Sequence, residues 1–148
     1  MASFLVPAMI AGVDLISKKI VRKNLREGER KELIKDKFYF WRVKNTGAAF
    51  NMLEENPKAV LVISGVISGI IGGLFMFHRK DPGERLRAVA LALCLGGAAG
   101  NLIDRISQKG VTDFIYIKKG KLPIFNVADA SIFIGGAILV LSALFKKE

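Results

Sequence analysis

Apolar residues in this 148-residue chain gather in four long blocks, and charged residues gather between them. The blocks cover residues 2–21, 57–77, 86–105 and 122–145, and the longer polar segments cover residues 22–56 and 106–121. An α-helix rises about 1.5 Å per residue, so about 20 residues can cross a hydrocarbon core of about 30 Å. The pattern predicts a mainly α, integral membrane protein with four transmembrane helices in one domain, residues 1–148.

Four spans place both termini on one side of the membrane and the segments 22–56 and 106–121 together on the other side. The first block reaches a spanning length only if it continues through Lys18 and Lys19, whose ammonium groups can extend to the membrane surface. FYFWRVKN (38–45) and VTDFIYI (111–117) are rich in β-branched and aromatic residues, so both predict strands. Residues 22–37 are predicted to be an exposed polar stretch.

Glycine recurs every four residues in the second block, at Gly65, Gly69 and Gly73, and again in the third block as Gly96 and Gly100. Small residues at this spacing let two helices approach closely. We therefore predict a helix packed against each of these two glycine stripes.

The chain is strongly basic, with 23 Lys and Arg against 13 Asp and Glu and a formal net charge of +10. No basic run is interleaved with base-stacking aromatic residues, so we expect no nucleic-acid partner and favour anionic membrane lipids instead. Counted by the positive-inside rule, these cations would place the two long segments in the cytoplasm. The single His78 and single Cys94 exclude an intrachain disulfide and a Cys/His zinc site.

Several acids lie beside or within apolar sequence, where ionisable groups are costly and mark functional sites by default. Asp129 lies near one end of the fourth block, and the residues alone leave Asp104 and Asp113 open as its partner. Two carboxylates in a partly dry pocket cannot both ionise easily, so one keeps a proton while the other is a base. Such a pair can activate a water molecule for attack on an amide.

Other polar residues share helical faces with one another. Asp14 and Lys18 are four residues apart, and their spacing leaves a plain ion pair and a site role equally open. Asn101, Asp104 and Arg105 fall on one face, and an Asp104–Arg105 ion pair at the helix end is the simplest interpretation of the last two.

Five motifs follow one another along the chain: Asp14-(x3)-Lys18, Asn45-Thr-Gly-Ala-Ala-Phe50, Gly100-Asn101-Leu-Ile-Asp104-Arg105, Val111-Thr-Asp113-Phe and Phe125-Asn126-Val-Ala-Asp129. Each motif alone is weak, but five in this order, spread over all four spans, are highly specific. Together they resemble lipoprotein signal peptidase (signal peptidase II), the aspartyl protease family of the bacterial inner membrane.

The resemblance implies that Asp113 and Asp129 are the catalytic pair. It implies substrate-binding or supporting roles for six further residues: Asp14, Lys18, Asn45, Asn101, Arg105 and Asn126. The implied substrates are prolipoproteins that carry a diacylglyceryl group on the lipobox cysteine, with cleavage just before that cysteine. The resemblance further implies no metal or cofactor, inhibition by globomycin, and a small β-rich extramembrane cradle between the first two spans.

On orientation the resemblance contradicts the cation count, because it implies cytoplasmic termini and an active site at the outer leaflet. We follow the resemblance, since aspartates that act on translocated substrates must face outward, and we expect a monomer. The main alternative function is a small four-span proton- or cation-coupled transporter, whose acids should lie near the bilayer midplane. The expected positions of Asp113, outside any span, and of Asp129, near a span end, favour a hydrolase.

Overall fold

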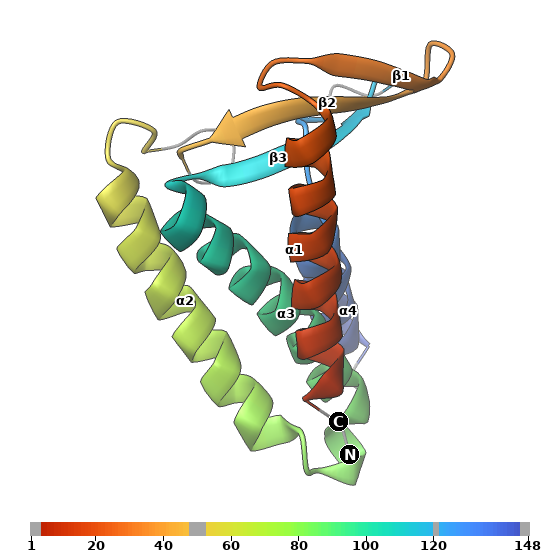
Figure 1. Ribbon diagram of the computed structural model, residues 1–148. Helices are drawn as coiled ribbons and strands as arrows, with labels where there is room; N and C mark the ends of the chain where they lie inside the picture. Colours follow the sequence, from red (N-terminus) through yellow and green to blue (C-terminus); the bar gives the residue numbers. More distant parts are fainter. Residues whose placement is uncertain (1–3, 48–52, 120–121, 146–148) are drawn as a thin grey trace.

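The computed structural model describes residues 4–47, 53–119 and 122–145 (Figure 1). In chain order, its elements are helix α1 (Leu5–Asn24), strands β1 (Arg30–Ile34) and β2 (Phe38–Asn45), helix α2 (Pro57–His78), a 3-10 turn η2 (Pro82–Glu84), helix α3 (Arg85–Gln108), strand β3 (Val111–Ile117) and helix α4 (Val127–Leu144). The predicted mainly helical architecture with a small β-rich part is therefore confirmed.

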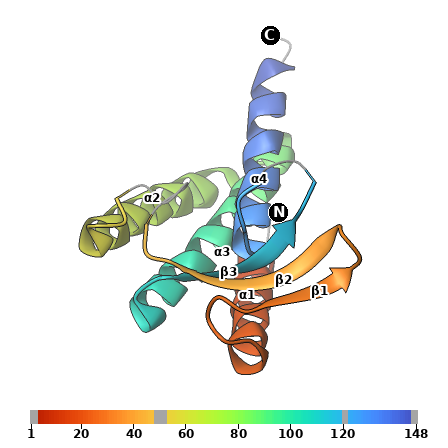
Figure 2. The ribbon, with the colours of Figure 1, turned by 90° about the horizontal axis from the view of Figure 1, so that it is seen from above.

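The sheet lies across one end of the helices, while α1 begins and α4 ends at the opposite end (Figure 1). Helix α3 packs against α1, α2 and α4. Helix α2 leans away from α1 and α4, as both views show (Figures 1 and 2). This arrangement brings the end of α1, the end of α3 and the start of α4 together beneath the sheet.

Within the part of the chain that the structure describes, three helical segments are long and apolar enough to cross a membrane: α2, α4 and the continuous segment Pro82–Gln108 that contains α3. Helix α1 has 20 residues but carries more charge. Its Asp14 and Lys18 side chains are fully buried, and over most of its length its exposed large side chains are apolar: Leu5, Met9, Val13, Ile16 and Ile20. The exposed Lys19 and Lys23 lie toward its C-terminal end. Helix α1 therefore also presents an apolar surface over most of its length, because Asp14 and Lys18 pair with each other inside the bundle.

The three strands form one antiparallel sheet in the order β1-β2-β3. The strands predicted at residues 38–45 and 111–117 are confirmed. Most of residues 22–37 are exposed, as predicted; the sequence did not indicate that α1 continues to Asn24 or that residues 30–34 form the strand β1. All five residues of β1 are exposed, and a polar composition of this kind suits an edge strand.

The glycine pair in α3 makes the close contact that its spacing predicts. A Cβ atom added at Gly96 would lie 2.6 Å from Ile10 Cβ, and one added at Gly100 would lie 2.5 Å from Asp14 Oδ2. Real Cβ atoms do not approach other atoms so closely, so larger residues would push α1 away from α3. The two glycines thus allow the buried polar side chains of α1 to reach α3.

The glycine stripe in α2 does not behave as predicted. Among the described residues, nothing lies within 4 Å of a Cβ atom placed at Gly65, Gly69 or Gly73. Helix α2 packs on α3 through a different face, on which Phe75 is fully buried against Leu91. The prediction fails because small-residue spacing indicates where a helix could approach, but not whether this chain supplies one.

Helix α4 also begins later than its sequence predicts. The fourth apolar block begins at residue 122, but residues 122–126 lie outside the helix, and Phe125 among them forms a β-bridge with Ile115. The helix starts only at Val127, with Asn126 as its N-cap. The local reason is a capping box. The Asn126 side chain accepts a hydrogen bond from the backbone N–H of Asp129, and the Asp129 side chain accepts one from the backbone N–H of Asn126.

Candidate active site

Strand register brings Asn45 to Asp113. Val43 of β2 lies opposite Asp113 of β3, and Asn45 lies opposite Val111. Residues two apart on a strand share a face, so Asn45 and Asp113 are diagonal neighbours on one face of the sheet. The Asn45 Nδ2 atom donates a hydrogen bond of 3.2 Å to Asp113 Oδ2.

Asp129 is held by the first turn of α4. Its backbone N–H donates to Asn126 Oδ1 at 2.8 Å, and its Oδ2 atom accepts from the Asn126 backbone N–H at 3.2 Å. This reciprocal capping box fixes the carboxylate beside the helix N-terminus. Its other oxygen, Oδ1, accepts a hydrogen bond of 2.8 Å from Asn101 Nδ2 of α3.

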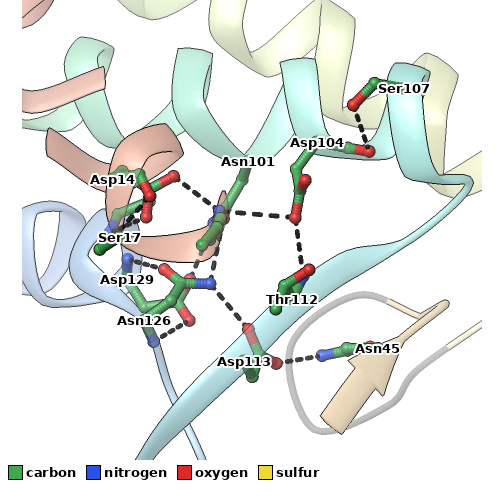
Figure 3. Close-up of polar contacts among 12 residues, drawn as sticks. Asp14, Ser17, Asn45, Asn101, Asp104, Ser107, Thr112, Asp113, Asn126 and Asp129 are labelled. Carbon is green, nitrogen blue, oxygen red and sulfur yellow. Dashed lines mark hydrogen bonds and ion pairs between the residues drawn. The ribbon is translucent and has the colours of Figure 1, made fainter. Parts of the chain in front are cut away.

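Asn126 links the two aspartates (Figure 3). Its Nδ2 atom donates to Asp113 Oδ1 at 2.7 Å, while its backbone N–H donates to Asp129. The same Nδ2 atom lies 3.2 Å from Asn101 Oδ1. Each of the four carboxylate oxygens thus accepts a hydrogen bond from a neutral amide group. We call this set the amide cluster: Asp113, Asp129, Asn45, Asn101 and Asn126.

Burial gives Asp113 an unusual protonation behaviour. The residue is only 5% exposed. Burial first, and then the nearby charge of Asp129, raise the pKa of Asp113 from 3.8 to about 7; the hydrogen bonds from Asn45 and Asn126 oppose this rise. Neutral amides stabilise a carboxylate less than a cation would. Asp113 can therefore hold a proton near neutral pH.

A second group of buried charges lies next to the amide cluster. Lys18 Nζ lies 2.6 Å from Asp14 Oδ2 and 4.0 Å from Asp104 Oδ2, and Arg22 Nη1 lies 2.8 Å from Asp104 Oδ1. We call these four residues the ion-pair cluster. Lys18 Nζ also donates to Asn101 Oδ1 at 2.8 Å, so this cluster directly supports the amide cluster.

The ion-pair cluster holds the chain segments that carry the two aspartates. Asp14 Oδ1 accepts a hydrogen bond of 2.9 Å from the backbone N–H of Ala128, next to Asp129. Asp104 Oδ2 accepts one of 2.7 Å from the backbone N–H of Thr112, next to Asp113. Arg22 Nη1 also donates to Thr112 Oγ1 at 2.9 Å. Each catalytic candidate is therefore flanked by a backbone contact to a buried acid.

Sequence reasoning misassigned one ion pair and missed two residues. The structure pairs Asp104 with Arg22 of α1 instead of Arg105, because adjacent residues of a helix do not face the same direction. Arg22 follows Lys18 by four residues, a spacing that could have identified it. No sequence signal indicates Thr112, since its main contact uses a backbone N–H.

Arg105 faces the amide cluster without a hydrogen bond to it. Its Nη2 atom donates to the Gly47 carbonyl at 3.3 Å, and its charge acts on both Asp113 and Asp129. Its Nε atom is buried and has no hydrogen-bond partner among the described residues. In the Asn45 motif, residues 48–50 lie outside the described residues. The Arg105 Nε atom is a donor that a bound ligand could use.

The structure brings all eight predicted site residues to the end of the helices beneath the sheet. They come from five elements: Asp14 and Lys18 from α1, Asn45 from β2, Asn101 and Arg105 from α3, Asp113 from β3, and Asn126 and Asp129 from the start of α4. His78 ends α2 at the opposite end of the molecule (Figure 1). The fold and site together define a helical membrane protein with an acidic polar site at one end of its bundle.

Comparisons with known proteins agree with this class. The family model described as Signal peptidase (SPase) II matches residues 6–145. The lipoprotein signal peptidase of Bacillus subtilis is 36% identical over 155 aligned residues, covering 100% of this chain and 99% of the relative. That of Shouchella clausii is 35% identical, covering 97% and 93%.

Solved structures are similar as well. Two structures described as bacterial membrane enzymes superpose with TM-scores of 0.83 and 0.81 at 26% and 27% identity. Each similarity covers 97% of this chain, and 91% and 92% of the respective neighbours. The chain belongs to the signal peptidase II family, and it is therefore a bacterial membrane protein of a protease family.

Proposed function

We propose that this protein is an aspartic endopeptidase that removes the signal peptide from diacylglyceryl-modified bacterial prolipoproteins. Cleavage falls just before the lipidated cysteine. Membership of the signal peptidase II family supports a signal-peptide substrate, and the names of the relatives support a lipoprotein precursor. The aspartic mechanism rests on the geometry of the amide cluster.

The observation that carries the proposal is the link through Asn126. This residue donates to Asp113 Oδ1 at 2.7 Å and, through its backbone, to Asp129 Oδ2 at 3.2 Å. The raised pKa of Asp113, about 7, supplies a protonated acid next to a second carboxylate. One acid and one base side by side are what water-mediated amide hydrolysis requires.

The proposed reaction uses both carboxyl groups in turn. Asp129 takes a proton from a water molecule as the water oxygen forms a bond to the scissile carbonyl carbon, and Asp113 donates its proton to the carbonyl oxygen. In the second step the C–N bond breaks, Asp129 donates its acquired proton to the amine that leaves, and Asp113 recovers a proton as the carboxyl product forms. No other reactant than water is consumed.

Arg105 and the asparagines position the reacting groups in this proposal. Asn45, Asn101 and Asn126 hold the carboxylates in place through the hydrogen bonds described above. The Nε atom of Arg105, which has no hydrogen-bond partner among the described residues, donates to a backbone carbonyl of the substrate. Asp14 and Lys18 act through Asn101 and Ala128, so they are positioning residues and not catalytic ones.

The location of the site supports a hydrolase over a carrier. Asp113 lies on a strand and Asp129 lies in the first helical turn, so both carboxylates belong to the sheet end of the bundle. A transporter needs acids near the midplane that are accessible from both sides. A site at the membrane surface suits a lipidated peptide, whose acyl chains stay in the bilayer while the peptide reaches the carboxylates.

A cleavage assay tests the function directly. The purified protein is incubated in detergent with a diacylglyceryl-modified prolipoprotein and with the same precursor without the lipid. We expect cleavage of the lipidated precursor alone, with the lipidated cysteine at the new N-terminus, and inhibition by globomycin. Cleavage of both precursors would reject the proposed substrate, and cleavage of neither would reject the function.

We further propose that both termini are cytoplasmic and that the sheet faces outward. Cysteine labelling of intact cells tests this orientation, using Lys119→Cys at the sheet end and Lys80→Cys at the opposite end. Both lysines are exposed, and the native Cys94 is buried. A membrane-impermeant maleimide should label residue 119 and not residue 80; the reverse result would support the orientation that the cation count predicts.

A further inference from the structure

The β1–β2 hairpin extends sideways beyond the helices. From above, its turn lies past α1 and α4 (Figure 2), and the side view shows the same overhang (Figure 1). The helices end beneath the sheet, so a hairpin that projects laterally at this level lies over the lipid beside the protein. The hairpin turn is formed by Lys35, Asp36 and Lys37, with Asp36 in the left-handed conformation at φ 57°.

The end of this hairpin carries exposed apolar side chains that have no role in the candidate active site. Leu33, Ile34 and Phe38 are 50%, 51% and 38% exposed. Ile34 and Phe38 are register partners on the two strands, so they form one contiguous apolar end. Three exposed large apolar side chains at the tip of a polar hairpin need a partner to cover them.

Cations surround this apolar end. The whole hairpin, residues 30–38, and the neighbouring end of β3 carry six cationic side chains and two acids: Arg30, Lys31, Lys35, Lys37, Lys118 and Lys119 against Glu32 and Asp36. Asp36 is paired with Lys118 at 2.8 Å, and Glu32 accepts the Asp36 backbone N–H at 2.7 Å. Asp36 is thus engaged by Lys118 and Glu32 by the hairpin backbone, and the cations outnumber the acids, so the outward field of this surface is positive.

We propose that this surface, which we call the hairpin tip, docks on anionic phospholipid headgroups of the leaflet beside it. The apolar side chains enter the headgroup–acyl boundary, and Lys31, Lys35 and Lys37 contact the phosphates. Apolar residues flanked by lysines are the pattern of interfacial membrane binding. We propose lipid as the binding partner because the hairpin overhangs the side of the bundle, and the transmembrane helices hold it permanently at the bilayer surface.

This docking fixes the sheet relative to the membrane. Strand β2 joins the hairpin tip to Asn45, and β3 beside it carries Asp113. A tip attached to headgroups therefore resists tilting of the strand that delivers one carboxylate of the amide cluster. It also accounts for the excess of cations at the sheet end, which faces outward in the proposed orientation although the positive-inside rule would place so many cations in the cytoplasm.

Hydrogen–deuterium exchange of the full-length protein in lipid nanodiscs tests the proposal. Exchange is measured in phosphatidylcholine alone and in phosphatidylcholine with phosphatidylglycerol. We expect the backbone amides of residues 30–38 to exchange several-fold more slowly in the anionic discs, and high salt to remove most of this difference. Equal exchange of residues 30–38 in the two lipids would overturn the proposal.

Variants identify the side chains involved. The double variant Lys35→Gln/Lys37→Gln should lose the protection by anionic lipid, and so should Leu33→Ser/Ile34→Ser. The matched control Lys80→Gln/Arg85→Gln removes two exposed cations at the opposite end of the bundle and should keep it. If anionic lipid still slows amide exchange in Lys35→Gln/Lys37→Gln, then other groups cause the protection and the proposed role of the hairpin tip is wrong. An Asp113→Asn protein should show wild-type protection, so this result is independent of the proposed peptidase activity.

Discussion

Two groups of buried acids lie side by side at the sheet end of the bundle, and they are neutralised in different ways. In the ion-pair cluster, Asp14 and Asp104 are balanced by Lys18 and Arg22. In the amide cluster, Asp113 and Asp129 receive hydrogen bonds only from amide groups among the described residues, with Arg105 at longer range. The contrast separates acids that hold the structure from acids that are available for proton transfer.

The physical difference lies in the charge of the donors. A cation at contact distance removes most of the cost of burying a carboxylate, so the pair is inert but rigid. An amide only partly offsets that cost, and two carboxylates near each other repel, so one of them keeps a proton. In the proposed mechanism, the ion-pair cluster is the rigid support and the amide cluster supplies the reactive pair.

The largest expected effect is the loss of activity when either acid of the amide cluster is replaced. Asp113→Asn and Asp129→Asn remove the proposed acid or base, and we expect cleavage of a lipidated precursor to fall by at least about 1,000-fold. Both proteins should still insert into membranes and elute from size-exclusion columns like the wild type. Wild-type turnover in either variant would contradict the assigned roles.

Within the ion-pair cluster, we expect replacement of Lys18 to cause the largest loss of stability. Lys18→Met leaves the buried Asp14 carboxylate without its cation, and we expect a loss of about 3–5 kcal/mol in the free energy of unfolding. Lys19→Met is the matched control, because Lys19 is exposed and should change stability by less than about 0.5 kcal/mol. The free energy of unfolding of the two variants is measured in mixed micelles. Similar values would show that Lys18 does not stabilise the fold.

The amide cluster should also cost stability at neutral pH. Because the pKa of Asp113 is raised from 3.8 to about 7, the folded state binds more protons than the unfolded state between these values. Its contribution is therefore most favourable below pH 4 and falls by about 2–4 kcal/mol as the pH rises to 7. Asp113→Asn should flatten the decline of melting temperature over this range; an unchanged slope would contradict the raised pKa.

The variant Asp104→Asn tests whether Asp104 positions the catalytic residues or takes part in the reaction. The amide can still accept the Thr112 N–H, but it loses the charge that pairs with Arg22, so the position of Asp113 is less well fixed. We expect measurable turnover, reduced by up to about 100-fold, with a pH profile like that of the wild type. Asp81→Asn, at an exposed acid of the opposite end, serves as control. Complete loss of turnover in Asp104→Asn would move Asp104 into the reacting set.

The smallest expected effect is a shift of the pH profile. Activity should fall as the pH rises through about 7, because Asp113 loses the proton that it donates. Asn45→Ala removes a hydrogen bond that favours the ionised form, so the pKa of Asp113 rises further and the decline moves to higher pH by a fraction of a unit. The measurement is kcat/KM against pH; a shift to lower pH would contradict this role of Asn45.

Much of the architecture follows from the chain itself. Blocks of apolar residues long enough to span a bilayer predict helices regardless of their partners, and β-branched and aromatic runs predict the strands at 38–45 and 111–117. These conclusions depend only on composition and spacing, which are local properties. Polar groups next to hydrocarbon are rare and therefore drew attention to the acids beside the apolar blocks, whereas the roles of the individual site residues were implied by the resemblance to a known family.

The residues alone left Asp104 and Asp113 open as the neighbour of Asp129; the family resemblance implied Asp113, and the tertiary structure supplies the physical reason. Arg22 meets Asp104 across 82 positions of sequence and Thr112 across 90, and the α2 glycine stripe is without a partner among the described residues. These outcomes depend on how helices pack and how strands align, and a one-residue change of register would turn Asp113 to the other face of the sheet. The sequence determined which polar groups are present beside the apolar blocks; packing determined which of them meet a cation and which meet another acid.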